Sequence, residues 1–498
     1  MPRPISSVST SGRSRLRHAV LFFGLLSLVA AGCQARATAT PAPEPTVATA
    51  APPASTLAPT PPAFEAQPIP NGPVLLRDDL TLRQVLEAGG GTVKLVLNPA
   101  DGRLYYLQPG NGIYRVNLDD GSKQRVASAT AITGNAAGMA IGPDGSLYVV
   151  TNAKVGENQT RAVIRRAAPA GEDDYTWTTL ASTDPYPLSN TPFDHLYNGI
   201  VVSPDGEWIY VNAGSRTDHG EVESNNDAFP DVREVALTAR ILRLSTTAEE
   251  LVLPNDEAAL ADLGVVYATG TRNAFDLAFA PNGDLFAIDN GPDADFPDEL
   301  NWIRPGLHYG FPWRFGIEDN PQQFPGYDAA ADPRLSQDFT AVQIGAYHDD
   351  PAFPPVPGEF TGPLVNHGPA ATVYRSRDGA EHDAAAEGQT LTTFTPHISP
   401  LGLVFAADTS LPADLQAGSD GSSSAFLVSW GAAGGDLTYR GQELLHLRLT
   451  KQGDNYAAVT TAVARGFQNP IDAVLIENRL YVLEFGGNGA IWELTFAP

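Results

Sequence analysis

Apolar runs come in pairs along much of the chain, and a short polar turn separates the two members of each pair. A typical unit has an apolar triplet, then often Pro, then Asp or Asn with Gly, then a second apolar triplet. Clear copies lie at residues 94–107, 138–150, 199–211 and 276–288, and weaker copies lie at 402–412 and 472–483. β-Branched and aromatic runs favour strands, and Pro-Asp-Gly or Pro-Asn-Gly favours the tight turn between them. The pattern therefore predicts six β-hairpins.

Six hairpins that share one pattern predict an all-β fold, a six-bladed β-propeller with long inter-strand insertions. Helical periodicity is limited to modest candidates at residues 80–89 and 248–264. An array of β-sandwiches is the structural alternative, but no linker-like stretch interrupts residues 90–497. The last apolar run, 480–496, ends the chain on a strand, which suits a ring closed by its terminal strands. We expect the insertions to crowd one face, where loops usually carry function.

The first 32 residues have the pattern of an export signal. Three arginines within residues 13–17 precede a short apolar run, and Cys33 follows directly. This run is too short and wrongly flanked for a transmembrane helix. The lone cysteine after Ala-Ala-Gly predicts a bacterial lipoprotein signal with lipidation at Cys33. A plain secretory signal with an incidental cysteine is the alternative, because Ala30 stands where such signals usually have Leu.

Residues 33–72 are dominated by Ala, Thr and Pro, a composition that predicts a disordered, partly extended tether. The propeller is expected to occupy residues 73–498. A lipid at Cys33 would hold this domain on the outer face of a bacterial membrane, and without the lipid the domain would be secreted. The chain has one cysteine, so an internal disulfide is excluded.

The formal net charge of the chain is −26, and the signal region contributes arginines but no acidic residue. This charge argues against nucleic acid or anionic lipid as a partner, so membrane contact is expected only through the lipid anchor. It is compatible with cation binding and with a small neutral sugar as substrate. A merely soluble acidic surface accounts for it equally well.

Candidate chemistry is densest at residues 267–313. Arg272 and Asn273 stand just before an expected inner strand, and an acidic loop at 289–299 follows the next strand. Carboxylates and free loop carbonyls are ligands that suit calcium, although a solvated acidic loop is the alternative because no regular ligand spacing is present. Asp194 and His195 likewise stand directly before a strand, where His195 is either a catalytic base or a packed loop histidine.

Two motifs in this region resemble the glucose/sorbosone dehydrogenase family. They are RN-x3-LAF-x-PNG-x-LFA, beginning at Arg272, and DELN-x-IRPG-x2-YGFP, ending at Pro312. The resemblance extends through the hairpins and TARILRLS to SPLGLVFA, and covers roughly residues 75–497. It implies a six-bladed propeller that oxidises an aldose, from its C1 hydroxyl to a lactone, with pyrroloquinoline quinone (PQQ) and calcium. The acceptor that takes the electrons onward is not implied.

The resemblance also implies roles for individual residues. His195 lies nine positions before Pro204, the family's spacing, and would take the C1 hydroxyl proton while hydride passes to the quinone. Asp194 would orient His195 or bind near it. Arg272 and Asn273 match the pair that contacts the quinone.

Two calcium sites are implied in the same way. Gly291 and Pro292 match the pair whose backbone carbonyls hold the catalytic calcium beside PQQ. Glu299 and Tyr309 match a second, structural calcium site, through a carboxylate and a carbonyl respectively.

The sequence departs from the family pattern at several cofactor-binding positions. The family has Pro-Gln-Gly after Arg-Asn, whereas this chain has Ala274, Phe275 and Asp276. Thr133 stands where the family has Gln or Glu, and Trp430 stands where it has Lys. The family's Arg-x-Arg is replaced by NPID at residues 469–472. PQQ is a tricarboxylate, so these losses should weaken its binding unless Arg440 or Arg465 approaches from elsewhere.

Three functions remain open on the sequence. The first is an exported quinoprotein oxidoreductase. The second is a cofactor-less propeller that binds carbohydrate or protein at the cell surface, which the missing cations favour. The third is a calcium-dependent lactonase or hydrolase, for which no matching set of inward Glu, Asn and Asp residues is identifiable.

Overall fold

The computed structural model describes residues 72–171, 174–407 and 410–497. The predicted export signal, the lipidation at Cys33 and the tether up to residue 71 lie outside the described residues. The α-helices of the described part are short: α1 (Ala129–Ile132), α2 (Glu257–Leu263) and α3 (Thr340–Gln343). None of these has the length or apolar character that crossing a membrane requires.

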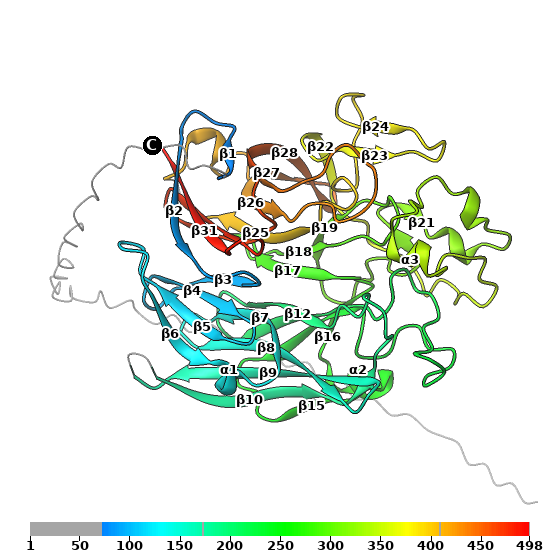
Figure 1. Ribbon diagram of the computed structural model, residues 1–498, viewed down its shortest axis with the longest axis horizontal. Helices are drawn as coiled ribbons and strands as arrows, with labels where there is room; N and C mark the ends of the chain where they lie inside the picture. Colours follow the sequence, from blue (N-terminus) through cyan, green and yellow to red (C-terminus); the bar gives the residue numbers. More distant parts are fainter. Residues whose placement is uncertain (1–71, 172–173, 408–409, 498) are drawn as a thin grey trace, which may run out of the picture. The chain divides into compact units, whose positions relative to one another are not determined.

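Six sheets succeed one another along the chain and form the six blades of a β-propeller, which confirms the predicted fold class (Figure 1). Blade 1 contains β3 (Lys94–Asn98), β4 (Arg103–Gln108), β5 (Gly112–Val116) and β6 (Lys123–Ser128). Blade 2 contains β7 (Asn135–Ile141), β8 (Leu147–Val155), β9 (Gln159–Pro169) and β10 (Tyr175–Thr183), with β11 (Tyr186–Pro187) and β15 (Leu251–Leu253) at its edges. Blade 3 contains β12 (Tyr197–Val202), β13 (Trp208–Ala213), β14 (Arg240–Ser245) and β16 (Val266–Thr269).

The second half of the chain forms the other three blades. Blade 4 contains β17 (Ala274–Phe279), β18 (Leu285–Asp289) and β19 (Glu299–Ile303). Blade 5 contains β25 (Pro400–Ala406), β26 (Ser423–Ser429), β27 (Glu443–Gln452) and β28 (Asn455–Arg465), joined by β1 (Val74–Leu75) and β22 (Val365–Pro369). Blade 6 contains β29 (Pro470–Ile476), β30 (Arg479–Glu484), β31 (Ala490–Phe496) and β2 (Leu80–Glu87). The long insertion between β19 and β22 holds β20 (Arg314–Phe315), β21 (Glu318–Asp319) and α3, and a β-hairpin of β23 (Val373–Arg375) and β24 (Glu381–Asp383) follows β22.

Strand β2 closes the ring, because it pairs antiparallel with β31 at the far end of the sequence, Leu80 opposite Phe496. The predicted closure by terminal strands is thereby confirmed. The modest helix candidate at 80–89 was wrong, because tertiary pairing with β31 makes Leu80–Glu87 a strand. The second candidate is helical only over Glu257–Leu263, where Asp256 caps the helix N-terminus and Gly264 ends it in a left-handed conformation.

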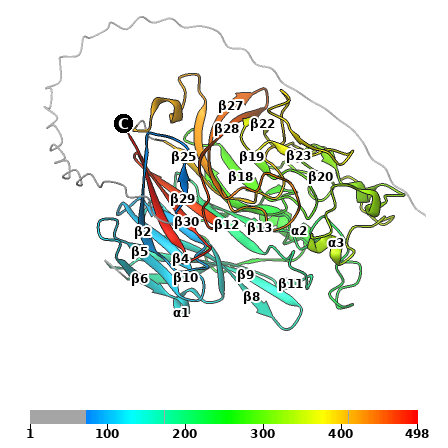
Figure 2. The same ribbon diagram turned by 45° about the horizontal axis from the view of Figure 1, so that its top comes forward.

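The inner strands of the blades are β3, β7, β12, β17, β25 and β29, and each packs against the next around the ring (Figures 1 and 2). At the first position of the hairpin repeat, three blades have glycine. A Cβ at Gly138 would lie 2.0 Å from the carbonyl oxygen of Asn198, and one at Gly199 would lie 2.6 Å from that of Phe275. Glycine is therefore required where neighbouring inner strands approach this closely.

The other three blades carry charged residues at the same repeat position, and these residues meet. The Lys94 ammonium lies 2.6 Å from Asp276 Oδ1 and 3.3 Å from Asp472 Oδ2. Each carboxylate also accepts a backbone N–H from a neighbouring inner strand, Asp276 from Leu403 and Asp472 from Leu95. This channel ion cluster, Lys94 with Asp276 and Asp472, therefore links blades 1, 4, 5 and 6 inside the ring.

Candidate active site

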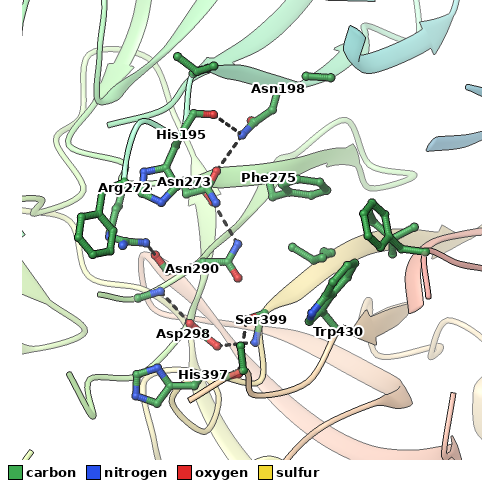
Figure 3. A pocket seen from close by; sticks show the side chains of 18 of the residues that line it. His195, Asn198, Arg272, Asn273, Phe275, Asn290, Asp298, His397, Ser399 and Trp430 are labelled. Carbon is green, nitrogen blue, oxygen red and sulfur yellow. Dashed lines mark hydrogen bonds between the residues drawn. The ribbon is translucent and has the colours of Figure 1, made fainter. Parts of the chain in front are cut away.

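A cavity of about 690 Å³ is lined by residues at or next to the start of all six inner strands. Each inner strand lines it with the residue that precedes the first repeat position: Val93, Ala137, Asn198, Phe275, Leu401 and Ile471. The cluster is one residue further along three of these strands. Four sequence-predicted site residues, His195, Arg272, Asn273 and Gly291, line the same cavity (Figure 3).

His195 is held by one of its ring nitrogens. Nδ1 lies 3.0 Å from the Ser215 hydroxyl and 3.3 Å from the Ser215 carbonyl oxygen. The carbonyl only accepts, and the hydroxyl donates its own proton to the Thr217 carbonyl at 2.8 Å, so Nδ1 must be the donor. Nε2 then carries the lone pair. Burial, together with the charge of Arg272, lowers the His195 pKa to about 3, so the ring is neutral at neutral pH.

Asp194 is engaged elsewhere. Both of its carboxylate oxygens accept the Ser189 N–H, at 2.9 and 3.0 Å, and burial raises its pKa. The hydrogen bond that orients the His195 ring comes from Ser215, so the orienting role that the sequence assigned to Asp194 belongs to Ser215. Ser215 lies in the insertion after β13, and no sequence motif marked it.

Three hydrogen bonds hold the Arg272 guanidinium in place. Its Nη2 and Nε donate to the carboxylate and carbonyl of Asp218, both at 2.6 Å, and its Nη1 donates to the Asn290 carbonyl at 3.1 Å. Burial alone would raise the Asp218 pKa, but the Arg272 charge and a hydrogen bond from His219 outweigh it and lower the pKa. The guanidinium is therefore rigid, and much of its charge is already balanced.

Asn273 is fixed by a neighbour that sequence reasoning missed. The Asn198 amide donates to Asn273 Oδ1 at 2.8 Å (Figure 3). Asn198 Oδ1 in turn accepts from Asn212 at 2.7 Å. The available signal was a polar residue at the start of an otherwise apolar strand. These amides add uncharged donors and acceptors to a cavity wall that holds two histidines and an arginine.

The predicted catalytic calcium residues are only partly arranged for a metal. Gly291 lines the cavity and donates its N–H to Asp298 at 2.7 Å, whereas the Pro292 carbonyl already accepts from the Ala294 N–H at 2.7 Å. Next to Gly291, Asn290 Oδ1 is buried without a hydrogen-bond partner in the described residues. An orphaned amide oxygen at the cavity edge is a ligand that fits a hard cation.

Glu299 and Tyr309, the predicted second calcium pair, do come together. With Asp289 they line a small separate cavity of about 10 Å³, room for roughly one water molecule or ion. Burial and the neighbouring Asp289 raise the Glu299 pKa to about 8, and burial raises the Asp289 pKa to about 6. Two buried carboxylates at a hole of this size fit a small cation. In the described residues no three His, Cys, Asp or Glu side chains form a metal-binding group, so backbone oxygens would have to complete the shell.

The cavity matches a flat aromatic ligand better than a highly charged one. Phe275, Trp430 and Phe339 supply aromatic walls. Among its described lining residues, Arg272 is the one arginine and lysine is absent. Arg440 donates instead to the Ala432 and Gly435 carbonyls, and Arg465 lies at the end of β28. The aromatic walls therefore suit the planar rings of PQQ, and a cation would be needed to balance its carboxylates.

Comparison with known proteins connects this geometry to one family. Residues 158–339 match the model of the family described as glucose / sorbosone dehydrogenase, which confirms the resemblance predicted from the sequence. Quinoprotein glucose dehydrogenase B of Acinetobacter calcoaceticus is 26% identical over 338 residues, or 60% of this chain and 66% of that protein. The match therefore spans slightly less than two thirds of that relative's length.

Solved structures share the fold. The apo-form of soluble aldose sugar dehydrogenase from Escherichia coli aligns with a TM-score of 0.51 and 13% identity, over 84% of this chain and 99% of that one. The holo form of the pyranose dehydrogenase PQQ domain from Coprinopsis cinerea aligns with a TM-score of 0.51 and 15% identity, over 84% and 96%.

Proposed function

We propose that this chain, an enzyme similar to the glucose/sorbosone dehydrogenases, oxidises the C1 hydroxyl of a small neutral aldose to a lactone, with PQQ and calcium. One observation carries the proposal: Ser215 holds the proton of His195 on Nδ1, which leaves the Nε2 lone pair at a cavity that Arg272 and Asn273 also line. A general base needs this tautomer at the operating pH.

The residues of this chain would divide the work as follows. His195 Nε2 accepts the C1 hydroxyl proton as the C–H bond of C1 loses hydride. Ser215 keeps the ring in place and stabilises the imidazolium through its hydroxyl and carbonyl oxygens. Arg272, held rigid by Asp218, stabilises negative charge that develops in the cavity. PQQ, when bound, supplies the two-electron acceptor for the hydride.

Calcium would be held by oxygen ligands at two places. At the main cavity these are the Asn290 side-chain oxygen and the Gly291 backbone, and in the small cavity they are Asp289 and Glu299. Its charge would offset the carboxylates of PQQ, which the described side chains do little to balance.

A cofactor-less propeller that binds carbohydrate or protein is the second candidate. The ion pair between Arg272 and Asp218 favours it, because an arginine that is already neutralised contributes less to binding an anionic cofactor. Export and lipidation at Cys33 complete the proposal and rest on the sequence pattern of residues 1–33. Incorporation of labelled palmitate in a bacterial host, with Cys33→Ala as control, tests the anchor.

Titration of the purified chain with PQQ in the presence of calcium tests the enzyme. We expect saturable binding at micromolar PQQ, reduction of an artificial dye by an aldose, and a loss of roughly 10²–10⁴-fold in kcat for His195→Ala. His382→Ala is a matched control, because His382 pairs with Glu387, is 31% exposed and is not among the residues that line the cavity. Absence of PQQ binding with calcium present would reject the dehydrogenase and favour the cofactor-less propeller.

A further inference from the structure

A second histidine, His397, lies on the wall of the same cavity, and the family motifs did not mark it. It lies three positions before the start of β25 and lines the cavity with Ser399 and Phe339. Figure 3 places it across Asn290 and Asp298 from His195. Its side chain is 13% exposed, so a ligand in the cavity can reach it.

The His397 ring is held in one orientation by buried groups. Nε2 lies 2.9 Å from Asp295 Oδ1, and the Asp295 side chain is 1% exposed. The other oxygen of that carboxylate accepts from Arg375 Nε at 2.6 Å. Phe339 packs on the ring with a centroid separation of 4.5 Å. A carboxylate only accepts, so the Nε2 proton is fixed and, in the neutral ring, the Nδ1 lone pair is left without a partner in the described residues.

The backbone here adopts conformations that non-glycine residues rarely take. φ is 64° at His397 and 50° at Ser399, and on the opposite wall it is 59° at Leu196, next to His195. The Asp298 carboxylate holds the Ser399 N–H at 2.9 Å, and the Ser399 carbonyl accepts the Trp430 N–H at 2.9 Å. Left-handed residues that are fixed in this way cluster at functional sites.

A histidine with a purely structural role looks different in this fold. The His219 side chain has no exposed surface, its Nδ1 lies 2.9 Å from Asp218 and its Nε2 lies 3.2 Å from Gln322. Both of its nitrogens are therefore satisfied inside the protein. His397 has one nitrogen satisfied and a face on the cavity, as His195 does.

We propose that His397, oriented by Asp295, is a sugar-binding residue that accepts a hydrogen bond from a ring hydroxyl other than the one at C1. This inference rests on the proposed function and deepens it. Two histidines with fixed tautomers then present two lone pairs to one polyol from opposite walls. Contact at His397 decides which face of the sugar ring is seated, and so which epimers bring C1 to His195 Nε2.

The variants that test this follow from the backbone. His397→Gly removes the imidazole and suits φ of 64°, so it should fold, and His397→Asn keeps a hydrogen-bonding group in a residue that tolerates this conformation. His382→Ala is the control. The measurements are kcat and KM for glucose, its C2 epimer mannose and its C4 epimer galactose. Calorimetric binding of 1,5-anhydroglucitol is measured as well, because this sugar has no C1 hydroxyl and so cannot be oxidised at C1.

We expect His397→Gly to raise KM about 10-fold or more for the preferred epimer, to reduce discrimination between epimers, and to change kcat by less than about 3-fold. His397→Asn should recover part of the affinity. KM and anhydroglucitol affinity within about 2-fold of wild type in His397→Gly would overturn the proposal, as would failure of the wild type to bind any of these sugars. Binding of anhydroglucitol that depends on His397, in a chain that binds no PQQ, would support this inference while rejecting the dehydrogenase.

Discussion

Removal of the cation from the channel ion cluster is expected to destabilise the ring. In Lys94→Met, the carboxylates of Asp276 and Asp472 lose an ammonium at 2.6 and 3.3 Å. Their side chains are 5% and 3% exposed, so water cannot replace it. Breaking a buried ion pair in this way costs about 3–5 kcal/mol.

The expected shift in melting temperature follows from the size of the domain. Unfolding entropy is about 2.1 cal/mol/K per residue, or roughly 0.9 kcal/mol/K for roughly 420 residues. A loss of about 3–5 kcal/mol therefore lowers Tm by about 3–6 °C. Differential scanning calorimetry at pH 8 measures this. Arg166→Met, which breaks an exposed pair with Asp144, is the matched control and should shift Tm by less than about 1 °C.

The loss of stability in Lys94→Met is expected to depend on pH if it arises from charge, and not if it arises from lost packing. Burial, with repulsion from Asp276, already raises the Asp472 pKa from 3.8 to about 7, despite the attraction of Lys94. Without the attraction of Lys94, the folded pKa of Asp472 rises further above its unfolded value. The folded state then binds more protons than the unfolded state, so stability increases as pH falls from 8 to 5. The deficit of Lys94→Met should therefore shrink at pH 5.

Two results would refute this reasoning. One is a Tm for Lys94→Met within about 1 °C of wild type at pH 8, and the other is a deficit that is equal at pH 5 and pH 8. The double variant Lys94→Met/Asp472→Asn gives a further check. It removes one of the uncompensated charges, so it should recover part of the lost stability.

Three further predictions concern the cavity. Because the His195 pKa is lowered to about 3, kcat/KM should show no His195 titration between pH 8 and 5. The assignment would be contradicted if kcat/KM fell at acid pH with an apparent pKa between about 6 and 7 and His195→Ala removed this fall. Ser215→Ala should lower kcat about 10-fold with little change in KM, because the Nδ1 proton loses its hydroxyl acceptor; an unchanged kcat would remove Ser215 from the mechanism. Calcium should raise the Tm of the wild type, and Glu299→Gln should abolish most of that rise; calorimetry with and without chelator decides, and an equal rise in both proteins would place calcium elsewhere.

Much of the fold was predictable because the hairpin repeat is local. Apolar runs and turn residues within about a dozen positions specify five of the six inner pairs of strands, and the structure has a hairpin at each of these five. The weak copy at 402–412 was only half right, because its first run lies in β25 but the partner strand β26 begins later, at Ser423. Residues 80–87 were ambiguous for the opposite reason. Their state depends on β31, more than 400 residues away in the sequence, so no local pattern could decide it.

The candidate site was predictable only where a motif carried it. Spacing located His195, Arg272 and Gly291, and the structure places all three on one cavity. The partners that set their chemistry were not predictable. Asp194 is adjacent to His195 in sequence but binds the Ser189 N–H, while Ser215, 20 residues away, holds the ring. The local sequence determines where His195 lies along the chain. The direction of its side chain depends on how the insertion after β13, which contains Ser215, folds back toward it.

The first position of the hairpin repeat shows most clearly which features the sequence determines and which features depend on the tertiary structure. The sequence by itself determined that this position holds Lys94, Gly138, Gly199, Asp276, Gly402 and Asp472 in chain order, and that each begins a hairpin. Only closure of the ring decided that three of them meet. Lys94 and Asp276 are 182 residues apart, and their ion pair exists because inner strands from blades 1 and 4 face each other across the channel. No local stretch of sequence encodes an ion pair that forms only when the ring closes. The charged residues could therefore be identified from the sequence, but their contact could not be predicted.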